Sequence, residues 1–171
     1  MSVKDKIIES IFENPSRKYH LRELARKAKV NPNSVINSLK DLEREGIIRK
    51  ETKEHIVEIS ADLENPKFIA RKRVFNLSKF YDSNILEFLI KTYNPKSIIL
   101  FGSYSRGEDI KTSDVDLAII TPSENVVSFE TFEAKLNRKV HVMLVRYNNI
   151  SDEFYTSLIN GIVVYGYMDK K

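Results

Sequence analysis

The sequence predicts an α+β protein with two domains, at residues 1–60 and 83–171, joined by a connecting helix at residues 61–82. Two observations carry this expectation. The first domain reads as three short amphipathic helices followed by two strands. The second reads as strand, turn, strand, helix, strand, helix, strand, which is typical of a small α/β domain with a mixed sheet.

Apolar residues recur at helical spacing through the first domain. Val3, Ile7 and Ile11 belong to the stripe of the first expected helix. The third expected helix stops before Gly46, the place where glycine commonly follows a helix. The expected elements are helices at residues 3–13, 21–30 and 32–45, and strands at residues 47–51 and 55–59.

The run HLRELARKAKVNPNSVINSLKDLEREGIIRKE resembles the winged-helix family, and the resemblance covers about residues 4–60. It implies that the third helix enters the major groove of double-stranded DNA and that the two strands form the wing. The polar and basic side chains of these elements would contact bases and phosphates. The candidate DNA-binding residues are Asn31, Asn33, Ser34, Asn37, Ser38, Lys40, Arg49, Lys50 and Lys53. The alternative is a protein-docking or dimer module in which these charges are only solvated.

Charge is unevenly distributed along the chain. Residues 1–60 carry 13 Lys and Arg against 10 Asp and Glu, whereas residues 96–171 carry 9 against 10. The net charge of the whole chain is +4. A basic first half favours a polyanionic partner, but an excess of this size is common in ordinary domains.

Composition places the chain among globular proteins of the cytoplasm. It is 42% hydrophobic and 30% charged, and it has no cysteine, which excludes disulfides. No apolar run approaches the roughly 20 residues of a membrane span, so no membrane partner is expected. The first fifteen residues alternate charged and apolar side chains and do not read as a signal peptide.

The centre of the second domain is a strand, a glycine turn and a second strand. Ser97–Phe101 is a short apolar run, and Gly102 and Ser103 end it. The second strand is expected at residues 113–120, where alternation would place Asp114 and Asp116 on one face. Two neighbouring carboxylates repel each other, so a divalent cation is expected between them. Mg²⁺ prefers carboxylate oxygens and is the cofactor expected first.

The glycine turn predicts a phosphate contact. Gly102 allows close approach of the backbone, and Ser103 offers a hydroxyl and an N–H group. A short helix is expected from Tyr104 to Arg106, and its first amides would face an anion. Phosphate at the turn and a metal at the two aspartates together point to nucleotidyl transfer.

The run GSYSRGEDIKTSDVDL resembles the DNA polymerase β-like nucleotidyltransferases, and most of all their small minimal branch. The resemblance implies a nucleoside triphosphate substrate, ATP, held at Gly102 and Ser103, with Mg²⁺ or Mn²⁺ on Asp114 and Asp116. Arg106 is a further candidate contact to phosphate. Members of that branch include antitoxin partners that add AMP to HEPN-type toxins, so a toxin of this kind is a candidate acceptor.

The same residues allow two other interpretations. Gly102 and Gly107 have the spacing of a Walker A loop, but Glu108 and Asp109 stand where lysine and serine or threonine are required, which rejects an NTPase P-loop. A hairpin with two solvated aspartates on an edge strand is the other alternative. It leaves the Gly-Ser turn unexplained.

The family resemblance fails at one position. A helix is expected at residues 129–136 and a third strand at 139–146, where the family carries a third carboxylate and this chain has His141. Imidazole suits Mn²⁺ or Zn²⁺ better than Mg²⁺, so the metal that activates the acceptor would bind less tightly. His141 could act as the base, because histidine exchanges protons near neutral pH. Alternatively, His141 is uncharged, forms a hydrogen bond to one of the two aspartates, and belongs to a site that catalyses no reaction.

The last expected elements are a helix at residues 152–160 and a closing strand at 162–165. The sequence therefore leads to two hypotheses. The first is a winged helix fused to an active nucleotidyltransferase with Asp114, Asp116 and His141 as catalytic residues. The second is a DNA-binding transcriptional regulator whose second domain is inactive or senses a ligand. A homodimer would suit a palindromic DNA site.

Overall fold

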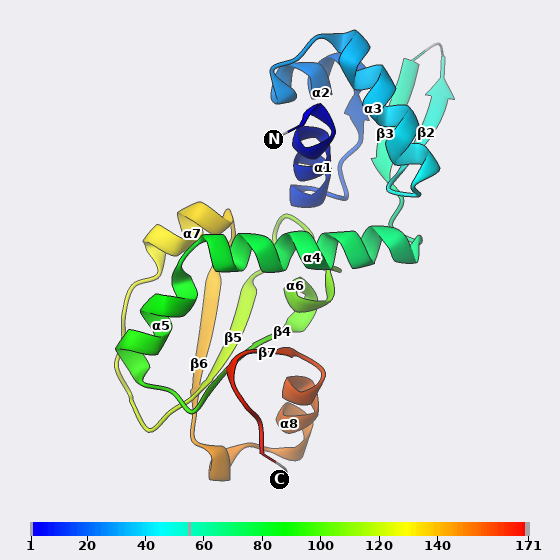
Figure 1. The fold of residues 1–171 in the computed structure, drawn as a ribbon. Helices are drawn as coiled ribbons and strands as arrows, with labels where there is room; N and C mark the ends of the chain where they lie inside the picture. The colour runs from blue at the N-terminus through cyan, green and yellow to red at the C-terminus, as the bar shows by residue number, and fades with distance from the viewer. Residues whose placement is uncertain (1, 55, 170–171) are drawn as a thin grey trace. The chain divides into compact units, whose positions relative to one another are not determined.

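The computed structural model describes residues 2–54 and 56–169, and His55, expected in the second strand of the first domain, lies outside that part. The chain divides into two compact units, residues 1–72 (unit 1) and residues 73–171 (unit 2) (Figure 1). The helix α4 (Pro66–Asp82) runs across this division.

Unit 1 contains three helices and a small antiparallel sheet in the order β1-β3-β2. Its elements in chain order are α1 (Val3–Glu13), β1 (Tyr19–His20), α2 (Leu21–Ala28), α3 (Pro32–Arg44), β2 (Ile48–Lys53) and β3 (Ile56–Ala61). The helix α1 begins with a capping box, in which the Ser2 hydroxyl accepts the Asp5 N–H at 3.1 Å and the Asp5 carboxylate accepts the Ser2 N–H at 2.9 Å.

The core of unit 1 lies between the three helices and the sheet. The apolar stripes of the helices supply Ile7, Leu24 and Leu39, which are buried. Tyr19 is fully buried on β1 and donates its hydroxyl to the Ser10 carbonyl at 2.6 Å. The sequence did not predict β1, because two residues are too few to show a pattern.

Unit 2 contains a four-stranded mixed sheet in the order β6-β5-β4-β7. Its elements in chain order, after α4, are α5 (Ile85–Tyr93), β4 (Ser97–Phe101), α6 (Gly102–Arg106), β5 (Val115–Ile120), α7 (Glu130–Leu136), β6 (Val140–Val145), the 3₁₀ helix η1 (Tyr147–Asn149), α8 (Asp152–Ile159) and β7 (Ile162–Gly166). β5 and β6 are parallel, whereas β4 is antiparallel to both β5 and β7. The mixed sheet expected from the sequence is therefore confirmed.

Helices cover both faces of this sheet (Figure 1). On one face, Leu100 and Leu117 pack with the apolar side of α5 and with Leu136 of α7. On the other face, Ala118 packs with Leu158 of α8. The side chains alternate between two cores, as expected for strands that are buried on both sides.

Most expected elements were correct to within a residue or two, and one difference touches the candidate site. The second strand was expected at residues 113–120, but β5 begins at Val115. Asp114 therefore lies in the loop that leads into the strand and not on the strand itself. The two strands that the sequence predicted to form a wing are also shifted slightly, to residues 48–53 and 56–61.

Candidate functional site

The glycine turn lies directly against the carboxylate of Asp116. β4 ends at Phe101, which pairs with Asp116 across the sheet, and α6 begins at the next residue, Gly102. Gly102 has φ +75°, and a Cβ atom there would lie 2.5 Å from Oδ2 of Asp116. Glycine is therefore required both by the left-handed backbone and by the lack of space. The sequence folds so that the turn and the acid form one surface.

His141 is the next neighbour of Asp116. The parallel register of β5 and β6 sets these two residues side by side, and His141 Nδ1 lies 3.3 Å from Asp116 Oδ1. The side chains are 59% and 28% exposed, respectively. Asp114 is exposed one residue before β5. The structure thus brings Gly102, Asp116 and His141 together at an accessible place, with Asp114 two residues away in the chain.

Ser103 and Arg106 belong to the single turn of α6. Ser103 is half-buried, and its carbonyl accepts the N–H groups of Gly107 and Glu108. The Arg106 guanidinium pairs with the Glu108 carboxylate at 2.8 Å, and both side chains are about half exposed. A surface pair of this kind contributes under about 1 kcal/mol. Arg106 can therefore leave Glu108 at little cost, and its contact with a nucleotide stays a prediction.

The donor set of this site suits a divalent cation through two carboxylates. In the part of the chain that the structure describes, no three His, Asp or Glu side chains gather as a metal-binding group. Asp114 and Asp116 have hard oxygen atoms of the kind that Mg²⁺ takes as ligands together with water and phosphate. The nearby imidazole of His141 is a nitrogen donor, and it fits Mn²⁺ better than Mg²⁺.

Three buried polar residues of unit 2 escaped the sequence analysis. Asn76 on α4, Asp109 in the loop after α6, and Arg138 before β6 are all less than a tenth exposed. Asp109 lies within the motif, but nothing in the local sequence sets it apart from its polar neighbours. No sequence signal marks Asn76 or Arg138, because their partners lie about thirty residues away in the chain.

The candidate DNA-binding residues of α3 fall into two groups. Asn33, Ser34, Asn37 and Lys40 are exposed along one side of the helix. Asn31, in contrast, is the N-cap, and its side chain accepts the Asn33 N–H at 2.8 Å. The half-buried Ser38 donates its hydroxyl to the Ser34 carbonyl at 3.1 Å. Two of the six polar candidate side chains are therefore already hydrogen-bonded to backbone groups of this helix.

Each cation predicted on the wing has an acidic neighbour. Arg49 pairs with Asp62 and Glu64 at 2.7 and 2.9 Å. Lys50 pairs with Glu43 at 2.6 Å. Lys53 lies 3.4 Å from Glu51 and 3.8 Å from Glu58. The strands predicted to form a wing thus present less unpaired positive charge than their sequence indicated, and the exposed Lys40 of α3 becomes the stronger candidate for a phosphate contact.

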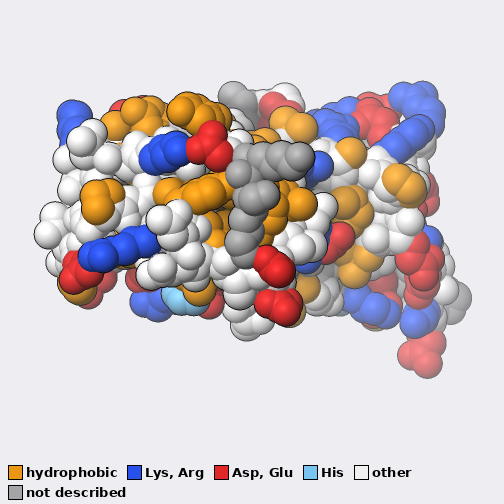
Figure 2. Space-filling view, turned by 90° about the horizontal axis from the view of Figure 1, so that it is seen from below, with side chains coloured by type: hydrophobic (Ala, Val, Ile, Leu, Met, Phe, Trp, Pro, Cys, Tyr) orange, Lys and Arg blue, Asp and Glu red, His pale blue; other side chains and the backbone are white. Residues whose placement is uncertain are grey.

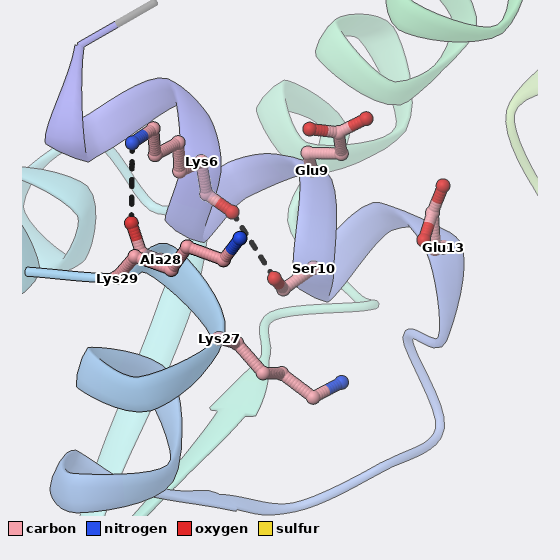
Figure 3. Close-up of a pocket in the computed structure, with 7 residues that line it drawn as sticks. All are labelled: Lys6, Glu9, Ser10, Glu13, Lys27, Ala28 and Lys29. Atoms are coloured by element: carbon pink, nitrogen blue, oxygen red, sulfur yellow. Dashed lines mark hydrogen bonds between the residues drawn. The ribbon is translucent and has the colours of Figure 1, made fainter.

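A shallow pocket of about 500 Å³ lies between α1 and α2 (Figure 3). Lys6, Lys27, Lys29, Glu9 and Glu13 supply its charges. Figure 3 shows Lys6 turned to the Ala28 carbonyl, to which its amine donates at 3.2 Å. Charges of both signs line the pocket, so it does not have the electrostatics of a triphosphate site.

Hydrophobic side chains gather on the face seen from below in Figure 2. The exposed apolar residues on α8, on β7 and just after it are Ile159, Val163, Tyr165 and Tyr167. None of the candidate catalytic residues lies on these elements. Of the helices in the described ranges, none is both long and apolar enough for a membrane crossing.

One curated relative resembles part of this chain. It is named "Putative protein adenylyltransferase MJ1379" and comes from Methanocaldococcus jannaschii. The two sequences are 45% identical over 40 residues, which is 23% of this chain and 40% of the relative. Since the similarity spans well under half of the relative, what the relative does is no direct guide to the whole of this chain.

A family model covers the second half of the chain. The family is described as polymerase beta, nucleotidyltransferase, and the match runs over residues 83–170. This range contains the glycine turn, both aspartates and His141, and it is just over half of the 171 residues. The chain therefore belongs to the polymerase β nucleotidyltransferase family.

Proposed function

We propose that unit 2 binds ATP together with Mg²⁺ or Mn²⁺ and transfers its nucleotidyl group to a hydroxyl group of a protein or small molecule. Gly102 and Ser103 hold the triphosphate, with Arg106 as a further phosphate contact. Asp114 and Asp116 hold the divalent cation. His141 stands where a base for the acceptor hydroxyl is needed.

One observation carries this proposal: the glycine turn touches the Asp116 carboxylate. A Cβ atom added to Gly102 would lie 2.5 Å from Oδ2 of Asp116, so there is no room for a side chain between the turn and this carboxylate. A phosphate at the turn and a cation on Asp116 would therefore be neighbours. Such closeness is what a metal that bridges a carboxylate and a triphosphate requires.

The proposed reaction exchanges one ester of the α-phosphate for another. The acceptor oxygen forms a bond to the α-phosphorus, and the bond from that phosphorus to the oxygen leading to the β-phosphate breaks. Pyrophosphate leaves with that oxygen, and the acceptor proton passes to a base. A bound divalent cation would neutralise negative charge on the triphosphate.

His141 is the residue placed to accept that proton. Its Nδ1 faces Asp116 at 3.3 Å, and its ring is 59% exposed, so the other nitrogen is open to a substrate. An imidazole held by a carboxylate is a common arrangement for a general base. The same contact also suits a neutral histidine that only supports Asp116, which is the inactive alternative.

A protein hydroxyl is the preferred acceptor. The relative from M. jannaschii is named a protein adenylyltransferase, and this name supports AMP transfer to a protein. A HEPN-type toxin is a candidate acceptor by the resemblance of the motif at residues 102–117. The exposed position of Asp114 and His141 supports a bulky acceptor, because a macromolecule needs an open site.

Calorimetric titration of ATP into the full chain, with Mg²⁺ and then Mn²⁺, tests this function. The variant Asp114→Asn/Asp116→Asn removes the proposed metal ligands. The control variant Glu124→Gln/Glu130→Gln removes two exposed acids of the same unit. We expect metal-dependent ATP binding in the wild type and the control, and its loss in the aspartate variant. Absence of binding with either metal would contradict the proposal and favour an inactive domain in a transcriptional regulator.

We also propose that unit 1 is a winged-helix module that binds double-stranded DNA. Its three helices and small antiparallel sheet suit this fold. The observation in favour is the division of α3 into a buried side, with Val35 and Leu39, and an exposed polar side, with Asn33 and Asn37. A helix of this kind can present amide groups to base edges.

A further inference from the structure

Asn76, Asp109 and Arg138 form a hydrogen-bonded cluster inside unit 2. The Asn76 amide donates to Oδ1 of Asp109 at 2.7 Å and to the Tyr104 carbonyl at 2.9 Å. The Arg138 guanidinium lies 3.3 Å from Oδ2 of Asp109. The Tyr104 hydroxyl donates in turn to the Asn76 carbonyl at 3.2 Å. Contacts of side chains and of backbone carbonyls thus connect the three residues of the cluster with Tyr104.

The charges of this cluster are withdrawn from water. The Asp109 side chain is 1% exposed and that of Arg138 is 4% exposed. Burial of two opposite charges gains little stability over an apolar pair of the same size, because desolvation offsets their attraction. Stability alone therefore does not explain the pair. What a buried polar cluster can supply is a fixed arrangement of the segments that it joins.

The segments joined here are those that carry the candidate site. Tyr104 lies on α6, two residues after Gly102, and Figure 1 shows α4 passing beside this helix. Asp109 lies midway along the loop from α6 to Asp114. Arg138 lies two residues before β6 and three before His141. The turn, the aspartates and the histidine are thus each tied to one cluster.

Asp109 is the anchor of a loop with few other inward contacts. Of residues 108–114, all of which the structure describes, only Asp109 has a buried side chain. The rest of the loop is exposed or half-buried and is closed by a local turn, in which the Ser113 hydroxyl accepts the Ile110 N–H at 3.0 Å. Without Asp109 the loop would lack its attachment to the core.

We propose that Asn76, Asp109 and Arg138 are positioning residues, which fix the separation between the glycine turn and the Asp114, Asp116 and His141 side chains. This inference rests on the proposed nucleotidyl transfer and names a requirement of that same site. The cluster touches no substrate. It acts by holding the loop, and misplacement by about 1 Å can cost about a hundredfold in rate.

The test uses the full chain and the variant Asp109→Asn/Arg138→Gln. This pair removes the two charges of the Asp109–Arg138 contact together and keeps polar side chains of similar size, so that neither of these two charges is left buried without the other. Arg146→Gln/Glu124→Gln is the matched control, since it removes an exposed Arg–Glu pair of the same unit, 2.8 Å long. Far-ultraviolet circular dichroism checks that all three proteins are folded.

Three quantities are measured for each protein. These are amide hydrogen exchange over residues 107–114, the dissociation constant of ATP with Mg²⁺, and the rate of pyrophosphate release from ATP with water as acceptor. We expect exchange to rise about tenfold or more in the cluster variant and pyrophosphate release to fall about tenfold to a hundredfold. ATP affinity should change by less than about fivefold, and the control should match the wild type.

Unchanged exchange in the folded cluster variant would overturn the inference, because the cluster would not hold the loop. Faster exchange with unchanged pyrophosphate release would overturn it too, because the cluster would then be structural only. A wild type that neither binds ATP nor releases pyrophosphate would instead contradict the proposed function. In that case hydrogen exchange alone decides whether the cluster holds the loop.

Discussion

The Gly102 backbone lies so close to the Asp116 carboxylate that a side chain at position 102 would overlap it. A methyl group at Gly102 would overlap Oδ2 of Asp116 at 2.5 Å. The overlap falls on an acid that β5 holds in register with Phe101. The carboxylate would have to move away from the turn, and its Oδ1 atom is the one that lies 3.3 Å from His141 Nδ1.

Gly102→Ala should therefore weaken metal-dependent ATP binding by about tenfold or more, through displacement of the Asp116 carboxylate. It should also lower the free energy of unfolding by about 1–2 kcal/mol, because alanine is disfavoured at φ +75°. Calorimetry with ATP and Mg²⁺ measures the first effect, and denaturant unfolding measures the second.

Gly46→Ala is the matched control for this change. Gly46 has φ +72°, and a Cβ there would meet the end of the Asn65 side chain in unit 1. The backbone cost is therefore similar, but the substitution lies outside unit 2. Equal loss of ATP binding in both variants would show that the effect of Gly102→Ala is general destabilisation.

The glycine turn and the two aspartates could be predicted because neighbouring residues in the sequence are enough to identify them. Gly102 and Ser103 end an apolar strand, and alternation along residues 139–146 indicated which side chains share a face with His141. Alternation could not tell which residue of β5 would stand opposite, because the register of a parallel pair depends on the whole sheet. The pairing of Asp116 with His141 appears only in the structure.

Long-range charge pairing was beyond the reach of the sequence. Asp109 follows Glu108 in a polar loop, and its partners Asn76 and Arg138 lie 33 and 29 residues away in the chain. The strand β2 of unit 1 shows the opposite case, in which a charge that the sequence predicts to be free is paired in the structure. Lys50 reads as a free cation, but the end of α3 supplies Glu43 to it. Folding decides which charges meet, and residue spacing does not reveal it.

His141→Asp should tighten the binding of ATP with Mg²⁺. A third carboxylate beside Asp116 adds a hard oxygen ligand and one more negative charge for the cation. We expect a gain of about tenfold in affinity, which corresponds to about 1.4 kcal/mol. Calorimetry with the purified variant measures it, and His141→Asn, which adds no charge, serves as control. Equal affinity in all three proteins would place residue 141 outside the metal site.

If the His141 imidazole binds the metal instead of accepting the acceptor proton, the wild-type site should prefer Mn²⁺ to Mg²⁺, and the preference should depend on His141. Imidazole nitrogen is a better ligand for Mn²⁺ than for Mg²⁺. The shift in thermal midpoint caused by ATP, measured with each metal and after chelation by EDTA, reports this preference. EDTA should abolish the shift, and His141→Asn should make the two metals more alike. If the His141→Asn variant still prefers Mn²⁺ to Mg²⁺, the preference does not come from His141.

Tyr19 should make unit 1 sensitive to alkaline pH. Burial raises the pKa of the Tyr19 hydroxyl from 10.0 to about 12. The protonated form is therefore favoured in the folded state, and this contribution is fully present below pH 10 and lost as pH rises through 12. The loss should be on the order of 2 kcal/mol.

Denaturant unfolding at pH 9 and pH 11 measures about half of this loss, because pH 11 lies midway between 10.0 and the raised pKa of about 12. In Tyr19→Phe the stability should fall less between the two values, although the variant also lacks the hydrogen bond to the Ser10 carbonyl. Tyr81→Phe is the control, because Tyr81 is 44% exposed and lies in unit 2. The same pH dependence in wild type and Tyr19→Phe would contradict this role of the buried hydroxyl.

Binding of DNA by unit 1 should depend more on α3 than on the wing. Lys40 is exposed on α3, whereas Lys50 is paired with Glu43. Lys40→Gln should weaken binding to duplex DNA about uniformly across sequences and reduce the salt dependence by about one phosphate contact. Lys50→Gln should have a smaller effect, because its partner already offsets its charge. Fluorescence anisotropy with a labelled duplex at several salt concentrations compares the two.

Asn37→Ala separates recognition of bases from attraction to phosphate. The Asn37 side chain is exposed on α3 and carries no charge. If it contacts a base edge, its loss should lower the preference for a specific site by about 1–3 kcal/mol and leave binding to random duplex unchanged. Wild-type protein that binds no duplex even at low salt would contradict the winged-helix proposal. That result would favour the alternative, in which unit 1 is a protein-docking or dimer module.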